Sequence, residues 1–177
     1  MTKREIPWTD HYQAVMDALR SRGLLLSAYG PDGRPNAMAI GWGLLGCVWG
    51  LPIWTVLVRP SRYTYRCIEH SKAFAVNVPG PDLAEACALC GSKSGRDMDK
   101  LSACNLTVER ASAAAAPTIA ECPIHYVCQV VHFNDVLPPN LADEVVASAY
   151  AGGNFHRVYF GKIVAVRAAP DAAKRVS

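Results

Sequence analysis

The chain has 177 residues, 51% of them hydrophobic and 19% charged, which is typical of one globular domain with a buried core and excludes a disordered chain. The net charge is only +3 without blocks of like charge, so no nucleic acid partner is expected. Because no apolar leader or membrane-spanning run occurs and the seven cysteines are an odd number, we expect a cytoplasmic protein with reduced thiols and no membrane association.

Apolar periodicity and turn residues divide the chain into short strands and a few helices. Apolar residues with helical spacing begin at Tyr12, and Gly23 follows the last of them, as at the end of a helix. Alternating or β-branched runs bounded by glycine and proline predict the strands. In chain order the sequence predicts a helix at 9–22, strands at 24–29, 36–45 and 48–58, a helix at 61–71, a strand at 74–78, a helix at 83–90, a helical turn at 97–101, a strand at 124–133, a helix within 138–150 and a strand at 158–166.

The strands mostly follow one another through hairpins rather than through regular helical crossovers. This order favours a mainly β fold, an antiparallel barrel with peripheral helices, over a doubly wound sheet. No repeat or domain boundary is visible, so the prediction is a single domain over residues 1–177, with the N-terminal helix at about 9–22 and the barrel at about 24–167.

The segment RPSRYT at residues 59–64 carries the clearest functional signal. It follows the predicted strand and opens a predicted helix, with Ser61 as the N-cap. A helix N-terminus offers free N–H groups and a positive dipole end, and here two hydroxyls and two guanidiniums lie beside it. This composition indicates a phosphorylated small molecule as ligand; the alternative is an ordinary helix cap with surface arginines.

A second anion-binding segment is CGSKSGRD at residues 90–97, which is rich in glycine, serine and basic residues. Such a loop can surround an anion with backbone amides, although a flexible surface loop is the alternative for this segment taken alone.

Two further motifs suggest other chemistry. GWGLLG at residues 41–46 matches the dinucleotide-binding glycine pattern, but Gly50 and Pro52 would break the helix that this pattern requires, so a strand bend or close approach to a flat ligand is favoured. Cys87 and Cys90 form a CxxC motif without a second one, and we expect buried structural thiols rather than a redox pair or a metal site. The candidate zinc ligands at residues 122–132 fall on a predicted strand, where alternation separates them.

In order along the chain, several stretches resemble the flavin reductase-like, FMN-binding split-barrel family, in particular its flavoredoxin-type branch. The resemblance extends over roughly residues 33–166 and rests on the stretches 35–43 (PNAMAIGWG), 58–64 (VRPSRYT), 74–79 (FAVNVP), 90–97 (CGSKSGRD), 121–123 (ECP) and 155–161 (FHRVYFG). It implies a Greek-key split barrel and a homodimer with FMN near the subunit interface.

The resemblance also assigns residues to the cofactor. The strand with Asn36, Ala37, Met38 and Ala39 would face the edge of the flavin ring system, and Asn77 and Val78 would border it. The remaining implied FMN contacts are to the phosphate and ribityl chain, from Arg59, Ser61, Arg62, Thr64, Ser92, Lys93, Ser94, Arg96 and Lys100. His156 matches a histidine near the reactive face of the ring, with a catalytic role or simple packing as the two interpretations.

Because no side-chain catalyst motif occurs, the chemistry is expected to come from the cofactor. The resulting hypothesis is an NAD(P)H-dependent flavin oxidoreductase that passes hydride or electrons through bound FMN. The alternative is a flavoredoxin-type electron carrier that receives electrons from a redox partner protein instead of from a nicotinamide nucleotide.

Overall fold

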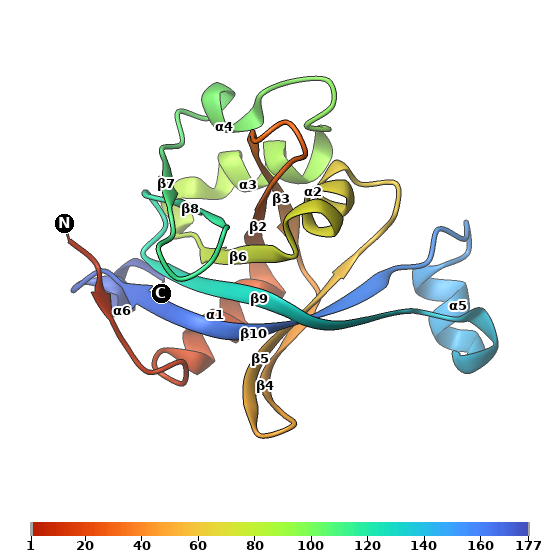
Figure 1. The fold of residues 1–177 in the computed structure, drawn as a ribbon. Coiled ribbons are helices and arrows are strands. Elements are labelled where there is room, and N and C mark those ends of the chain that lie inside the picture. Colours follow the sequence, from red (N-terminus) through yellow and green to blue (C-terminus); the bar gives the residue numbers. More distant parts are fainter. Residues whose placement is uncertain (1, 177) are drawn as a thin grey trace.

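The computed structural model describes residues 2–176, which form an eight-stranded antiparallel sheet and a separate two-stranded sheet, with helices around them (Figure 1). The strands are β1 (Arg4–Glu5), β2 (Leu24–Tyr29), β3 (Pro35–Ile40), β4 (Gly43–Val48), β5 (Leu51–Val58), β6 (Ala73–Val78), β7 (Val108–Arg110), β8 (Pro117–Ile119), β9 (Ile124–Asp135) and β10 (Arg157–Ala168). The helices are α1 (Tyr12–Ser21), α2 (Tyr63–Ser71), α3 (Ala84–Ser92), α4 (Lys100–Ala103), α5 (Asp143–Ala149) and α6 (Ala172–Arg175), with short 3-10 turns at Pro81–Leu83 and Pro138–Asn140.

The main sheet has the strand order β3-β2-β6-β9-β10-β5-β4, and β1 adds to β10. All paired strands are antiparallel. The two end strands, β3 and β4, are consecutive in the chain but do not pair, so the sheet stays open between them. This open, split arrangement confirms the predicted fold class.

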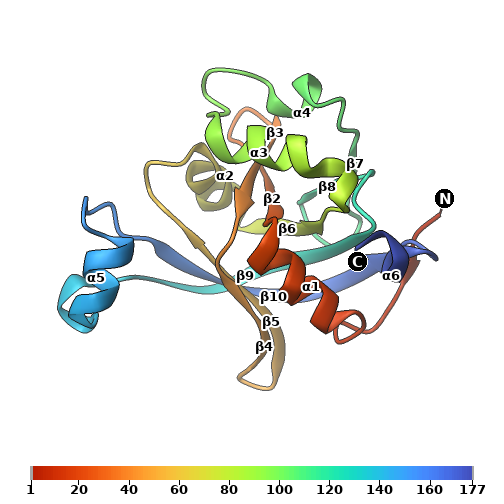
Figure 2. The same cartoon turned by 180° about the vertical axis from the view of Figure 1, so that it is seen from behind.

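Alternation along the strands separates a principal core from two smaller clusters, one of which contains Ala75 and Val127. On the inner face, Leu26, Val76 and Tyr126 from neighbouring strands pack with α1 and α2 in the principal core. On the outer face, Leu25 packs in a smaller core with α3 and α4. Figure 2 shows α1 and α3 on the side of the molecule turned away in Figure 1.

The structure differs from the predicted elements mainly where the chain turns. The strand predicted at 36–45 divides into β3 and β4 at Gly41 and Trp42. Ser61 is not the N-cap that the sequence predicts, because α2 begins at Tyr63, Arg62 occupies the N-cap, and Ser61 Oγ accepts a hydrogen bond from Asn154 instead. Gly91 does not end α3, which continues to Ser92.

Two arms extend from the body of the molecule (Figure 1): the β4–β5 hairpin, and the ends of β9 and β10 with α5. Large apolar side chains remain exposed on them, among them Leu44, Trp49 and Leu137. Within residues 2–176, no helix has the length and apolar character needed to cross a membrane.

Candidate functional site

Two adjoining pockets lie beside the open edge of β3. The first, here the β3–β4 pocket, has a volume of about 180 Å³ and is bordered by residues 38–42, Leu57, Arg59, Arg62 and His156. The second, the α2 pocket, has a volume of about 90 Å³ and lies between the N-terminus of α2 and the segment 90–100. Met38 and Arg62 line both, so the two pockets form one groove.

The α2 pocket has a strongly cationic lining. Among the described residues that line it are four cationic side chains and no carboxylate: Arg62, Lys93, Arg96 and Lys100. In residues 2–176, none of these four forms an ion pair. Because the first turn of a helix also leaves N–H groups without intrahelical partners, the pocket is suited to a multiply charged anion.

Lys100 is the most deeply placed of these cations. Only 4% of it is exposed, and its Nζ donates to the carbonyl oxygens of Cys90 and Lys93, both at 3.1 Å. Burial lowers the pKa of Lys100 below its usual value, and the nearby Arg62 charge acts in the same direction. An ammonium has three protons, so one remains for a ligand after these two contacts.

Close packing fixes the shape of the α2 pocket. Asn36 Nδ2 donates to Thr64 Oγ1 at 2.7 Å, in the buried first turn of α2. A Cβ on Gly95 would lie 2.0 Å from Asn36 Oδ1 and 2.9 Å from Tyr63 Cδ1. Only glycine therefore lets the 93–97 segment lie this close to β3 and α2.

Arg59 lies in the β3–β4 pocket rather than in the cationic one. Its guanidinium donates to three carbonyls of the 149–154 segment, those of Ala149, Gly153 and Asn154. The role implied for it by the resemblance, contact to the phosphate, stays a prediction; the contacts present in the structure are to the backbone.

The β3–β4 pocket contains an aromatic wall. The His156 imidazole, 8% exposed, lies 5.3 Å from the exposed Trp42 ring, and its Nδ1 is 2.8 Å from the Tyr150 hydroxyl. Burial, followed by the charges of Arg59 and Arg62, lowers the pKa of His156 to about 4. The imidazole is therefore neutral at pH 7.

The structure brings most of the sequence-predicted residues to the groove. Those that line it are Asn36, Met38, Ala39, Arg59, Ser61, Arg62, Thr64, Lys93, Ser94, Arg96, Lys100 and His156. Ala37, Asn77, Val78 and Ser92 do not line either pocket: the first three are fully buried in the core, and Ser92 Oγ donates to carbonyls of its own helix.

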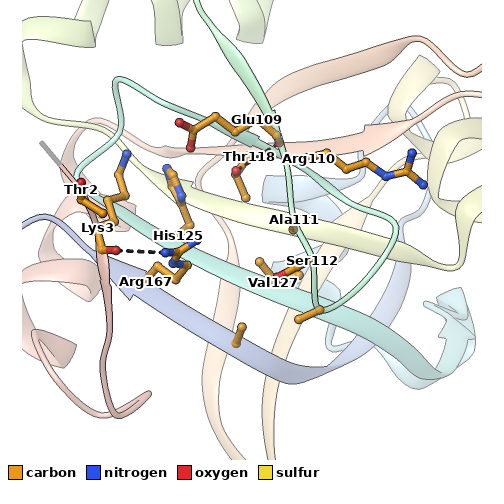
Figure 3. A pocket seen from close by; sticks show the side chains of 12 residues that line it. Thr2, Lys3, Glu109, Arg110, Ala111, Ser112, Thr118, His125, Val127 and Arg167 are labelled. Carbon is orange, nitrogen blue, oxygen red and sulfur yellow. Dashed lines mark hydrogen bonds between the residues drawn. The ribbon is translucent and has the colours of Figure 1, made fainter.

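Asn77 instead holds β8 against the outer face of the sheet. Its Nδ2 donates to Leu25 O at 3.0 Å and to Ser27 Oγ at 2.8 Å, and its Oδ1 accepts the N–H of Ile119 at 3.0 Å. His125 Nε2 lies 2.7 Å from the carbonyl of the same Ile119. Figure 3 shows His125 beneath the β7–β8 hairpin, where it lines a polar pocket with Lys3 and Thr118.

Sequence reasoning missed several residues of the groove. Leu57 lines it but was not predicted, whereas Tyr63, Gly91 and Gly95 line it from within the predicted anion-binding segments 59–64 and 90–97. The sequence predicts no role for Trp42 beyond its place in the glycine pattern, and it places Tyr150 only at the end of a predicted helix. A tryptophan between two glycines is a usable signal for an exposed ring, whereas no local pattern relates Tyr150 to His156.

The CxxC cysteines behave as core residues. Cys87 and Cys90 lie in the outer core, and burial raises the pKa of each thiol to about 11. Both thiols are therefore protonated at neutral pH and unreactive as nucleophiles, in agreement with the structural role expected for them.

Acidification should destabilise the fold before its carboxylates titrate. Burial also lowers the pKa of His125 to about 4, so both His125 and His156 bind a proton more readily when the chain is unfolded. The stability that the two neutral histidines contribute is fully present above about pH 6.5, the pKa of histidine in the unfolded chain. It is lost as the pH falls towards 4, and each histidine loses about 1.4 kcal/mol for every pH unit in this range. We expect the free energy of unfolding to fall by roughly 2 to 5 kcal/mol between pH 7 and 4.5.

Urea unfolding at pH 7, 6, 5 and 4.5 would measure this change. The variant His125→Asn/His156→Asn should have a flatter profile, and His70→Asn, at an exposed position on α2, should keep the wild-type slope. A wild-type stability that does not change over this range would contradict the two lowered pKa values.

Comparisons with known proteins agree with this geometry. The structure is similar to flavoredoxin from Methanosarcina acetivorans (26% identity, TM-score 0.69, covering 85% of this chain and 70% of that one) and to flavoredoxin of Desulfovibrio vulgaris (24%, TM-score 0.68, 84% and 70%). A protein named YddH from Escherichia coli K12 is 31% identical over 88 residues, so the match spans 50% of this chain and only 46% of that relative. The model of the flavin reductase like domain matches residues 16–176, and the chain therefore belongs to the flavin reductase-like family.

Proposed function

We propose that this chain binds FMN in the groove, with the phosphate in the α2 pocket and the ring system in the β3–β4 pocket, and that it acts as an NAD(P)H-dependent oxidoreductase. One observation carries the proposal: the buried Lys100 and three further cations, none of them in an ion pair within residues 2–176, converge on the N-terminus of α2. Charge-assisted hydrogen bonds to phosphate are among the strongest that side chains make.

The residues present fit FMN better than an unphosphorylated flavin. Arg62 joins the two pockets, so one side chain can contact both the phosphate end and the ring end of the ligand. Thr64 and Ser94 add hydroxyls to the cationic pocket, and Met38 and Ala39 give the other pocket an apolar edge. A polar end and a flat, mostly apolar end match the two halves of FMN.

FMN, when bound, would supply the hydride and electron transfer for which the chain itself has no catalyst motif. The protein would hold the phosphate through Lys100 and Arg62 and border the ring with Trp42 and His156. Because His156 is neutral at pH 7, it can donate a hydrogen bond to the ligand without placing a full charge beside the ring. The open edge between β3 and β4 leaves one side accessible to a reductant.

A second candidate is a flavoredoxin-type electron carrier, which the likeness to the Methanosarcina flavoredoxin favours. Mixing the FMN-loaded protein with NADH and then with NADPH in the absence of oxygen separates the two functions. Rapid loss of the oxidised flavin absorbance is expected for the reductase. An oxidised flavin that persists with both nucleotides, but is reduced by a low-potential partner protein, would favour the carrier.

We also propose that the protein is a homodimer with FMN near the interface. Leu44 is 68% exposed and Trp49 is 62% exposed on the β4–β5 hairpin, and Phe133 is 41% exposed on the second arm. Leu44 and Trp49 lie on the same short hairpin, and exposed apolar side chains that gather in this way are typical of interaction sites. The hairpin begins beside Trp42, so a partner bound to it would lie next to the β3–β4 pocket.

Sedimentation at micromolar concentration should give twice the mass of one chain. Leu44→Asp should shift the equilibrium to monomer, because it places a charge in the apolar contact, and Gln13→Asp on the exposed side of α1 should not. A wild-type monomer that retains FMN would refute the dimer without affecting the proposed flavin site.

A further inference from the structure

The turn after β5 holds the segment that precedes β10. Arg59 Nη1 donates to Asn154 O at 2.8 Å and to Gly153 O at 3.2 Å, and its Nη2 donates to Ala149 O at 2.9 Å. Asn154 Nδ2 donates to Ser61 Oγ at 2.8 Å. Four hydrogen bonds therefore connect Arg59 and Ser61 to the 149–154 segment, across about 90 positions in sequence.

The 149–154 segment depends on contacts of this kind for its shape. Gly153 and Asn154 adopt left-handed backbone conformations in succession, with φ values of 70° and 58°. Asparagine tolerates this region better than most residues but at a cost in free energy. The side chain of Ser61 and the guanidinium of Arg59 offset this cost, because they bind both the side chain and the carbonyl of Asn154.

The four hydrogen bonds from Arg59 and Ser61, here called the clamp, position Tyr150. Its ring is 5% exposed, stacks on Phe155 with centroids 4.7 Å apart, and lies under the Arg59 guanidinium at 5.2 Å. Its hydroxyl reaches His156 Nδ1 at 2.8 Å. The clamp therefore determines where the hydroxyl lies relative to the imidazole in the β3–β4 pocket.

The Arg59 charge beside the phenol ring favours one direction for this hydrogen bond. A guanidinium over the phenol ring stabilises electron density on the hydroxyl oxygen and makes the O–H a better donor. When the O–H donates to Nδ1, the proton of the neutral imidazole resides on Nε2. Within residues 2–176, no protein group forms a hydrogen bond with Nε2 of His156, and the ring lines the pocket.

We propose that Arg59 and Ser61 are positioning residues, which hold the 149–154 segment so that Tyr150 fixes His156 as the Nε2–H tautomer and presents that N–H to a ligand in the β3–β4 pocket. His156 would thus act as a hydrogen-bond donor to an acceptor atom of the ligand and not as a base. The tautomer is a property of the protein alone, whereas its use in turnover rests on the proposed flavin function.

Nitrogen-15 NMR of the histidine side chains in the flavin-free protein at pH 7 tests the tautomer directly. In the wild type, His156 should show a protonated Nε2 and an unprotonated Nδ1. Tyr150→Phe and Arg59→Lys should both give mixed tautomers, because one lacks the hydroxyl and the other cannot reach three carbonyls. Arg66→Lys, at an exposed arginine on α2, is the matched control and should retain the wild-type spectrum. A wild-type tautomer in both Tyr150→Phe and Arg59→Lys would overturn the proposal.

A second experiment compares the affinities of the same variants for FMN and for riboflavin. Arg59→Lys should change the ratio of the two affinities by less than twofold if Arg59 positions His156. A loss of the FMN preference would assign Arg59 to the phosphate and overturn its positioning role. Failure of the wild type to bind either flavin would refute the proposed function, while the NMR result would still decide the tautomer.

Discussion

Replacing Lys100 with methionine should weaken FMN binding by roughly ten- to a hundredfold, the equivalent of one lost hydrogen bond to a charged group. Methionine keeps the length of the side chain but removes the ammonium that faces the α2 pocket. Fluorescence titration of FMN against the purified apoprotein measures the change. Because Lys100 is buried and also holds the carbonyls of Cys90 and Lys93, the melting temperature of the apo variant has to be recorded alongside.

Riboflavin separates loss of the phosphate contact from damage to the fold. It lacks the phosphate, so its affinity should be similar in the wild type and in Lys100→Met. Lys162→Met, at an exposed position on β10, should bind both flavins as the wild type does. Equal weakening of FMN and riboflavin would indicate damage to the site rather than loss of a phosphate contact. An FMN affinity that does not change in Lys100→Met would place the phosphate elsewhere and would remove the main support for the proposed function.

The open antiparallel sheet could be predicted because its strands are apolar runs bounded by turn residues, although the assignment of residues to the two faces is visible only in the structure. Leu24, Leu26 and Ala28 face the inner core while Leu25 and Ser27 face outward, and hairpin turn residues join the successive strands. The composition of residues 59–64 and 90–97 likewise indicated an anion pocket before any geometry was known. Basic and hydroxyl side chains near a helix N-terminus are a local pattern, and local patterns are visible in a sequence.

The different roles of the residues within these segments could not be predicted from the sequence. Arg59 and Arg62 lie three positions apart in the same motif, but one binds carbonyls of residues 149–154 and the other lines the cationic pocket. Their difference depends on where a distant segment lies. The hairpin of β7 and β8 was missed for the same reason, since three-residue strands lack a detectable period and are held by side chains far away in the sequence.

Asn77 is the clearest of these distant anchors, and its replacement should have the largest effect on stability. Asn77→Ala removes two donors and one acceptor from a fully buried position. The N–H of Ile119 loses its acceptor, and Leu25 O and Ser27 Oγ each lose a donor, although Ser27 Oγ still donates to Pro117 O. Each buried polar group left unsatisfied costs about 1 to 3 kcal/mol, so we expect a loss of roughly 2 to 4 kcal/mol in the free energy of unfolding. For a chain of this length that corresponds to a fall of about 5 to 15 °C in the melting temperature.

The same variant distinguishes the role seen in the structure from the role implied by the family resemblance. If Asn77 anchors β8, FMN affinity measured well below the melting temperature should stay within about threefold of the wild type, because the side chain does not line the groove. Asn140→Ala, an exposed asparagine in the 3-10 turn Pro138–Asn140, should change neither quantity. A wild-type melting temperature combined with a large loss of FMN affinity would instead mean that Asn77 borders the flavin. The amide would then have to leave its three partners when the ligand binds, and the β7–β8 hairpin would move with it.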